Sequence, residues 1–270
     1  MIAEMYKRRE KLGYAFLGFL LLIIVGWFLL QPPETTSEWL EMLFLLMPIG
    51  FIVSIILISR SQYNKVKDVQ IPNSEQQLLN LNHVVIKKDA TLIPRLLLFE
   101  KDGKYIGMVK PLKIPWWLYP ISIFRDSMLV LFPLTYGFIS HDGETQFTFL
   151  KKGWLKQVKL TIFDQENNQI GTYIQEELKA LFHIKGELFN EKEEPILSIK
   201  ASGFSGDFSW KDEEGNQWAY FFNGKFPHEY TEIFRDTHND IVELSDKLSK
   251  QDKPRLLAVI GYLFMARIKQ

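Results

Sequence analysis

Two long apolar runs open the chain. The first covers residues 12–30, nineteen positions without a charged side chain, and the second covers residues 39–59, with Pro48 and Gly50 near its middle. A helix that crosses a bilayer needs roughly 17 to 25 predominantly apolar residues. Each run therefore predicts a transmembrane helix, and the short polar segment between them, residues 31–38, predicts a hairpin of two spans.

The first run has a second interpretation, as the apolar part of a secretory signal peptide. Such a peptide has a shorter apolar region and a small-residue cleavage site. Here the bulky residues 27–30 lead directly into Gln31 and two prolines. The sequence therefore favours a span that is retained.

Each of the two runs has lysine and arginine next to only one of its ends. They precede the first run and follow the second, and residues 31–38 contain neither. Because short loops rich in lysine and arginine stay in the cytoplasm, we expect a multi-pass membrane protein with both termini cytoplasmic. The cations that carry this prediction are Lys7, Arg8, Arg9, Lys11, Arg60, Lys65 and Lys67.

The pattern changes after the second run. Residues 61–82 are polar, with Pro72 and Asn73 among them, and predict a linker. From His83 onward short segments alternate apolar and polar positions, as Val158 and Leu160 do, and are separated by Asp-, Asn- and Gly-containing turns. About twelve short strands in consecutive hairpins are typical of an all-β barrel or sandwich.

The chain ends in another apolar run, residues 256–266. Pro254 precedes it, where a proline in the first turn of a helix is tolerated, and Gly261 is its one poor helix former. The run is apolar on every side, so the helix must be enclosed. Runs of about 10 to 14 residues are usually core helices rather than spans, which predicts a closed β-barrel around this helix.

Together these elements resemble the tubby-like barrel superfamily. The resemblance rests on hairpins of the form F-x-(D/N)-(E/K)-x-x-x-(I/P)-x-x-I, on the unit GDFSWKDEEGNQWAYF, on the following FRDTHNDIVEL hairpin and on the final apolar helix. The superfamily includes the tubby C-terminal domain, the LURP-one-related proteins and the phospholipid scramblases. The resemblance implies a twelve-stranded barrel around a C-terminal helix over residues 84–268, within a predicted domain of residues 83–270. The two N-terminal spans depart from these relatives, so location and partners do not carry over.

The sequence gives no sign of catalysis. It has no cysteine, which excludes disulfides, thiolate metal sites and thiol nucleophiles. It has neither a G-x-G-x-x-G motif nor a P-loop, and residues 203–206 lack the spacing of a serine nucleophile elbow. We therefore expect no enzyme, no metal and no cofactor. The histidines show no paired-ligand spacing; they are His83, His141, His183, His228 and His238.

Charge is balanced overall but unevenly placed. The 32 basic and 32 acidic residues cancel, which gives no basic field for nucleic acid. Residues 60–175 hold 15 basic and 10 acidic side chains, whereas residues 176–246 hold 7 and 16. This predicts a basic portion near the membrane and an acidic portion, Glu176 to Asp246, free for a protein partner.

Two cationic segments are candidate lipid-binding sites. In residues 110–125 tryptophans stand among cations, a combination suited to the bilayer interface; the alternative is that the rings pack on the barrel. Residues 151–159 hold four lysines and no acid, similar in character to the phosphoinositide-binding residues of tubby domains; the alternative is a solvated turn. The candidates are Lys110, Lys113, Trp116, Trp117, Arg125, Lys151, Lys152, Lys156 and Lys159.

These features predict a non-enzymatic binding or scaffold module, held at the membrane by its hairpin and reading anionic phospholipid headgroups or a protein partner. The alternative is a scramblase-like protein that translocates lipid, which follows from the resemblance alone. The calcium-binding pattern of scramblases is missing.

Overall fold

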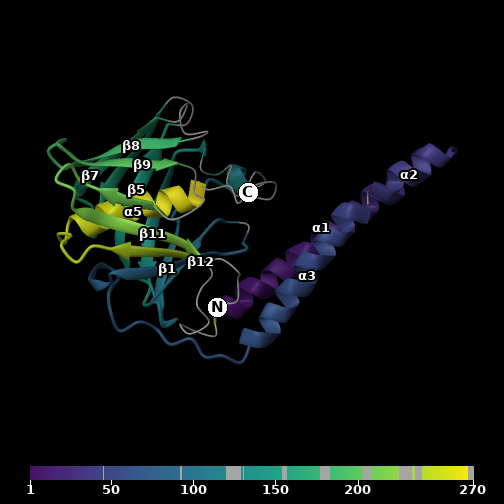
Figure 1. The fold of residues 1–270 in the computed structure, drawn as a ribbon, viewed down its shortest axis with the longest axis horizontal. Helices are drawn as coiled ribbons and strands as arrows, with labels where there is room; N and C mark the ends of the chain where they lie inside the picture. Colours follow the sequence, from purple (N-terminus) through teal and green to yellow (C-terminus); the bar gives the residue numbers. More distant parts are fainter. Residues whose placement is uncertain are drawn as a thin grey trace. The chain divides into compact units, whose positions relative to one another are not determined.

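The computed structural model describes residues 1–44, 46–91, 93–119, 129, 131–153, 157–176, 183–202, 208–224, 233–234 and 239–266. The chain divides into two compact units, Met1–Gln70 and Ile71–Gln270. Figure 1 shows a helical unit and a β-rich unit. Each is described by itself.

The first unit contains α1 (Ile2–Leu30), α2 (Thr36–Phe44) and α3 (Leu46–Val66). Two helical stretches, Ile2–Leu30 and Thr36–Val66, are long and apolar enough to cross a membrane, judged by length and composition. The helix pair α1 and α3 is packed closely at Gly13, where a Cβ atom would lie 2.6 Å from Cγ1 of Ile56. Nearby the ammonium of Lys7 lies over the ring of Tyr63. The predicted helical hairpin is therefore present.

The second unit is a nearly closed antiparallel barrel of twelve strands, in the order β10-β11-β12-β1-β2-β3-β4-β5-β6-β7-β8-β9. The sequence predicted a fully closed barrel. Among the described residues, however, no backbone ladder joins the two edge strands, β9 and β10. The strands are β1 (His83–Lys88), β2 (Leu96–Phe99), β3 (Tyr105–Pro111), β4 (Leu134–Ser140), β5 (Thr145–Lys152), β6 (Gln157–Phe163), β7 (Gln169–Glu176), β8 (His183–Asn190), β9 (Pro195–Ser202), β10 (Phe208–Lys211), β11 (Gln217–Gly224) and β12 (Asn239–Leu244).

Five hairpins turn in the same way. Each turn closes with a hydrogen bond from the fourth residue to the first carbonyl, and its fourth residue has a φ between 61° and 93°. The adjacent ladder then shifts register, as a bulge requires. Because antiparallel strands alternate direction, all five turns lie at one end of the barrel, called here the hairpin end. The residues with positive φ are Gly103, Gly143, Asn167, Glu193 and Gly215.

The C-terminal helix, α5 (Asp252–Ala266), lies in the barrel core. Ser249 caps its start by accepting a hydrogen bond from the backbone N–H of Asp252. Every residue from Lys253 to Met265 is buried, and the apolar ones share one cluster with inward-facing side chains of the strands. Figure 1 shows α5, in yellow, running among the strands. A solvent-free environment on every side explains why the run has no polar face.

The predicted linker, residues 61–82, is shorter in the structure. Helix α3 continues to Val66, and the backbone of Pro72 and Ser74 is hydrogen-bonded to that of Tyr105. Leu78 and Leu81 are buried in the barrel core. Burying a leucine contributes about 1.5–3 kcal/mol, enough to hold this otherwise polar segment on the barrel. The segment between the two packed parts is residues 67–70, called here the tether.

Candidate functional site

The connection between β3 and β4 crosses the end of the barrel opposite the hairpin turns, called here the connection end. Two of its leucines, Leu118 and Leu129, are fully buried in the barrel core. Leu112 lies against Gly137 of β4, where a Cβ atom would come within 2.9 Å of its Cδ2. These three leucines fix the connection on the barrel, and the turn η2 (Trp116–Leu118) is held between them.

Several large apolar side chains of this connection point into solvent. Trp116 is 83 % exposed, and Trp117 is 50 % exposed with one edge against the ring of Phe132. The sequence left two interpretations of these tryptophans, contact with the bilayer or packing on the barrel. Trp117 packs in part, through Phe132, and Trp116 is largely exposed. Contiguous exposed apolar surface marks interaction sites on soluble domains. We call this surface the aromatic patch; it consists of Leu112, Trp116, Trp117, Tyr119 and Leu131.

Lysines from neighbouring strands share this side of the barrel. Lys113 follows β3, and Lys152 of β5 lies directly opposite Lys159 of β6 in the strand register. All three are exposed, and Lys110 is half-buried. Like charges directly opposite each other destabilise a sheet. None of these four lysines forms an ion pair or hydrogen bond with another described residue.

Lys151 does not belong to this surface. Its side chain is 1 % exposed and shares the inner face of β5 with Phe147 and Phe149, and its Nζ donates a hydrogen bond to the Gly153 carbonyl. Successive side chains of a strand point to opposite faces, so Lys151 and Lys152 cannot both face solvent. Arg125 and Lys156, the remaining cationic candidates, lie outside the described residues.

The described residues on this side of the barrel are poor in acidic side chains. Strands β3, β4, β5 and β6 are neighbours in the sheet, and their described residues, with those of the β3–β4 connection, include no aspartate or glutamate. We call the outer surface of these four strands and of the described residues of the connection the acid-free face; Asp126 lies outside the described residues, and Glu176 lies on the adjacent strand β7. It carries the aromatic patch and the four lysines.

Many of the described carboxylates lie in the turns of the hairpin end, although Glu176 of β7 and Asp240 of β12 lie at the connection end. All five turns there are acidic, including the three turns that precede Glu176, while Lys185 and Lys200 lie on strands within the segment predicted to be acidic. Acidic turns from both portions of the sequence therefore meet at this end of the barrel. Hydrogen bonds from the Ser140 hydroxyl and the Glu144 backbone N–H lower the pKa of Asp142 in one of these turns. The turn carboxylates are Glu100, Asp102, Asp142, Glu144, Asp164, Glu166, Glu191, Glu193, Glu194, Asp212, Glu213 and Glu214.

Comparison with known proteins adds no identification: no family model, no curated protein and no solved structure matches this chain. The tubby-like resemblance therefore remains a prediction.

The described residues contain no group of three or more histidines, aspartates or glutamates that could hold a metal ion. His83 lies 3.4 Å from Glu243 at the surface, and His141 is exposed in a turn. His228 and His238, like residues 203–206, lie outside the described part of the chain.

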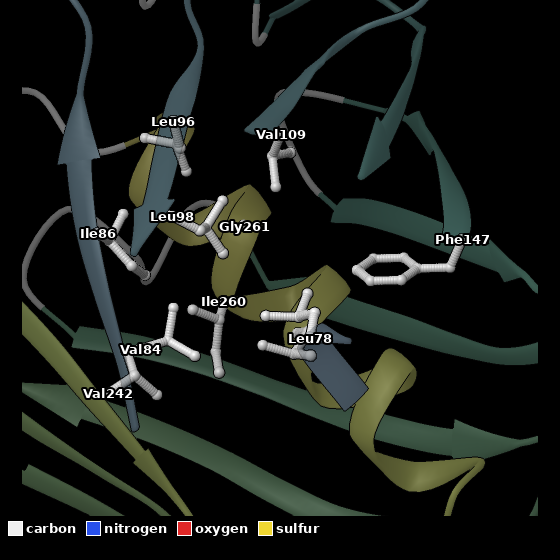
Figure 2. Close-up of a pocket in the computed structure, with 11 residues that line it drawn as sticks. Leu78, Val84, Ile86, Leu96, Leu98, Val109, Phe147, Val242, Ile260 and Gly261 are labelled. Atoms are coloured by element: carbon white, nitrogen blue, oxygen red, sulfur yellow. The ribbon is translucent and has the colours of Figure 1, made fainter. Parts of the chain in front are cut away.

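A small cavity of about 10 Å³ lies beside Gly261 inside the barrel. Figure 2 shows that aliphatic side chains from β1, β2, β3 and α5 surround it, with Phe147 at one side. A water molecule needs about this volume together with two to four polar partners. The lining offers no polar side chain, so this cavity is a packing defect and not a substrate site. It is lined by Leu78, Val84, Ile86, Leu96, Leu98, Val109, Phe147, Val242, Leu257, Ile260 and Gly261.

Proposed function

We propose that this protein is an integral membrane protein whose barrel is a non-enzymatic binding module, held at the cytoplasmic face and docking on anionic lipid. The two apolar helical stretches support membrane insertion. The lysines and arginines beside both stretches support the orientation. The twelve strands and the buried α5 are consistent with a tubby-like barrel wrapped around its terminal helix.

The acid-free face is the observation that carries the proposal. Tryptophan rings at headgroup level stabilise proteins at a bilayer surface, because one part of the ring is apolar and the indole N–H is polar. Trp116 is placed for this role by the buried Leu118 next to it. Lysines attract anionic lipid, by about 1 kcal/mol for each cation near the surface, and no described carboxylate on this face opposes that attraction.

The lipid-docking proposal is tested with a fragment of residues 71–270, which keeps Leu78 and Leu81 in the core. We expect the folded fragment to float with anionic vesicles and to remain in solution with neutral ones. Replacing both Trp116→Ala and Trp117→Ala should weaken flotation, because it removes the apolar part of the contact. Circular dichroism of each variant confirms that the fold is intact. Equal recovery with neutral and anionic vesicles would contradict the lipid reading and leave a membrane-held module for a protein partner.

The orientation is tested separately, and the cysteine-free chain makes the test clean. A cysteine introduced as Thr36→Cys should react with a membrane-impermeant maleimide in intact cells. Ser198→Cys or Asn216→Cys, both at exposed positions of the barrel, should react only after the cells are opened. The reverse pattern would place the barrel outside the cytoplasm.

A protein partner is the second candidate, and the acidic hairpin end is the observation that favours it. In this case the exposed turn carboxylates would meet a basic surface of the partner. The scramblase-like alternative rests on the family resemblance alone.

A further inference from the structure

The tether limits how far the barrel can move from the helices. Only residues 67–70 separate Val66, the last residue of α3, from Ile71, the first residue of the barrel unit. Five Cα–Cα steps span at most about 18 Å. Docking of the barrel on the bilayer that holds its own helices is therefore an intramolecular event. A short flexible connection sets effective concentrations in the millimolar range, so a weak contact is enough.

The contact on the acid-free face is weak and strongly electrostatic. Its exposed strand and connection cations are Lys113, Lys152 and Lys159. Each cation near an anionic surface changes the docked-to-free ratio about fivefold, so the three together change it about a hundredfold. That factor takes a barrel from about one docked molecule per ten free to about ten docked per one free. The attraction is screened over roughly 10 Å at 0.1 M salt and roughly 3 Å at 1 M.

We infer that the acid-free face makes the barrel a reversible sensor of membrane surface charge, docked where anionic lipid is abundant and released where it is scarce. This inference rests on the proposed function and adds how the same surface is regulated. The occupant of the face is the anionic bilayer itself, since the described residues of this face combine exposed tryptophans with exposed lysines and include no carboxylate. In the released state, the acid-free face is exposed to the cytoplasm.

The experiment uses the full chain in vesicles, with one environment-sensitive fluorophore on an introduced cysteine. Leu131→Cys, at a 41 % exposed position of the aromatic patch, reports contact of this patch with lipid. Asn216→Cys, in an exposed turn of the hairpin end, is the control position. Vesicles range from phosphatidylcholine alone to mixtures rich in phosphatidylglycerol, at low and at high salt. We expect the Leu131→Cys probe to enter an apolar environment as anionic lipid increases and to leave it as salt increases.

Two lysine variants of equal charge separate this surface from net charge. Changing Lys113, Lys152 and Lys159 to glutamine should lower the docked-to-free ratio about a hundredfold. The matched variant changes three other lysines to glutamine, namely Lys185, Lys192 and Lys200. These lysines are also exposed but lie outside the acid-free face. It should lower the ratio by less than about fivefold.

Each outcome decides something. If the probe contacts lipid in every vesicle, regardless of salt and of the lysines, docking stands and the sensor is overturned. If it never contacts lipid, both the sensor and the lipid-docking function are overturned, and the face is left to an acidic protein. If the Asn216→Cys probe contacts lipid instead, the wrong end of the barrel has been assigned. If both lysine variants lose docking equally, net charge and not this face controls it.

Discussion

At the hairpin end several acidic side chains are bonded to their own turns or to α5, whereas at the connection end Lys152 of β5 and Lys159 of β6 lie opposite each other. Asp164 accepts hydrogen bonds from the backbone N–H groups of Glu166 and Asn168, and Asp212 accepts one from Asn216. Such side-chain bonds stabilise turns, so much of this acidity has a structural cause. Lys152 and Lys159 at the other end form no ion pair or hydrogen bond with another described residue. The difference separates charges that build the fold from charges that remain available for binding.

Arg255 offers the most severe test of this difference. Its side chain is 5 % exposed at the hairpin end, where it donates hydrogen bonds to the Ile170 carbonyl, to Asp252 at 2.7 Å and to Glu191. We expect Arg255→Met to lower the free energy of unfolding by about 2–4 kcal/mol, because the buried Ile170 carbonyl and two partly exposed carboxylates lose a charged donor. Urea denaturation of the barrel fragment measures it. Lys113→Met at the connection end is the control and should change stability by less than about 0.5 kcal/mol. Equal effects at both ends would contradict the comparison.

The repeated turns give a smaller effect. Glu193 has a φ of 61°, where the equivalent residues of the other turns are glycine or asparagine. A left-handed conformation costs a residue with a side chain about 1 kcal/mol relative to glycine. Glu193→Gly should therefore raise stability by about 1 kcal/mol, and Gly215→Ala should lower it by a similar amount. No atom lies within 4 Å of a Cβ placed on Gly215, so this loss would measure backbone conformation alone. Thermal unfolding of both variants checks the two signs.

The smallest effect concerns the opposed lysines. Lys159→Gln removes the repulsion with Lys152, and we expect a gain of about 0.2–0.5 kcal/mol at low salt. The gain should disappear at high salt, because screening removes the repulsion in the parent protein too. Lys192→Gln, in an acidic turn, is the control and should show no gain. A gain that persists at high salt would show that the two ammonium groups do not repel each other.

Periodic apolar patterns predicted most of the fold. The helical hairpin, the strands and the C-terminal helix each repeat a local pattern that burial enforces. The segment before β1 was missed because Leu78 and Leu81 stand among polar residues, and only the barrel supplies the apolar surface that buries them. The two edge strands of the sheet, β9 and β10, follow each other in the sequence. A pattern of consecutive hairpins predicts that they pair, and it does not show that the ladder between them is missing among the described residues.

The candidate site was predicted less completely. The tryptophans were identified from their chemistry, but a run of lysines was treated as one surface although a strand directs Lys151 inward and Lys152 outward. The meeting of the acidic turns at one barrel end was also missed. It follows from the alternation of antiparallel strands, which brings turns from the whole sequence to one end. The sequence had predicted these segments as turns. The strand topology alone would therefore have shown that they lie together.

The packing of residues 71–82 also has a mechanical consequence. Any pull transmitted through the tether reaches the barrel first at the short parallel bridge between Asn73 and Tyr105. The next point under load is Leu78, which lies against α5 beside the small cavity. Tension would thus strip residues 71–77 from the surface before it disturbed the core. A force on the helical unit would therefore reach α5 only after residues 71–77 had separated from the barrel.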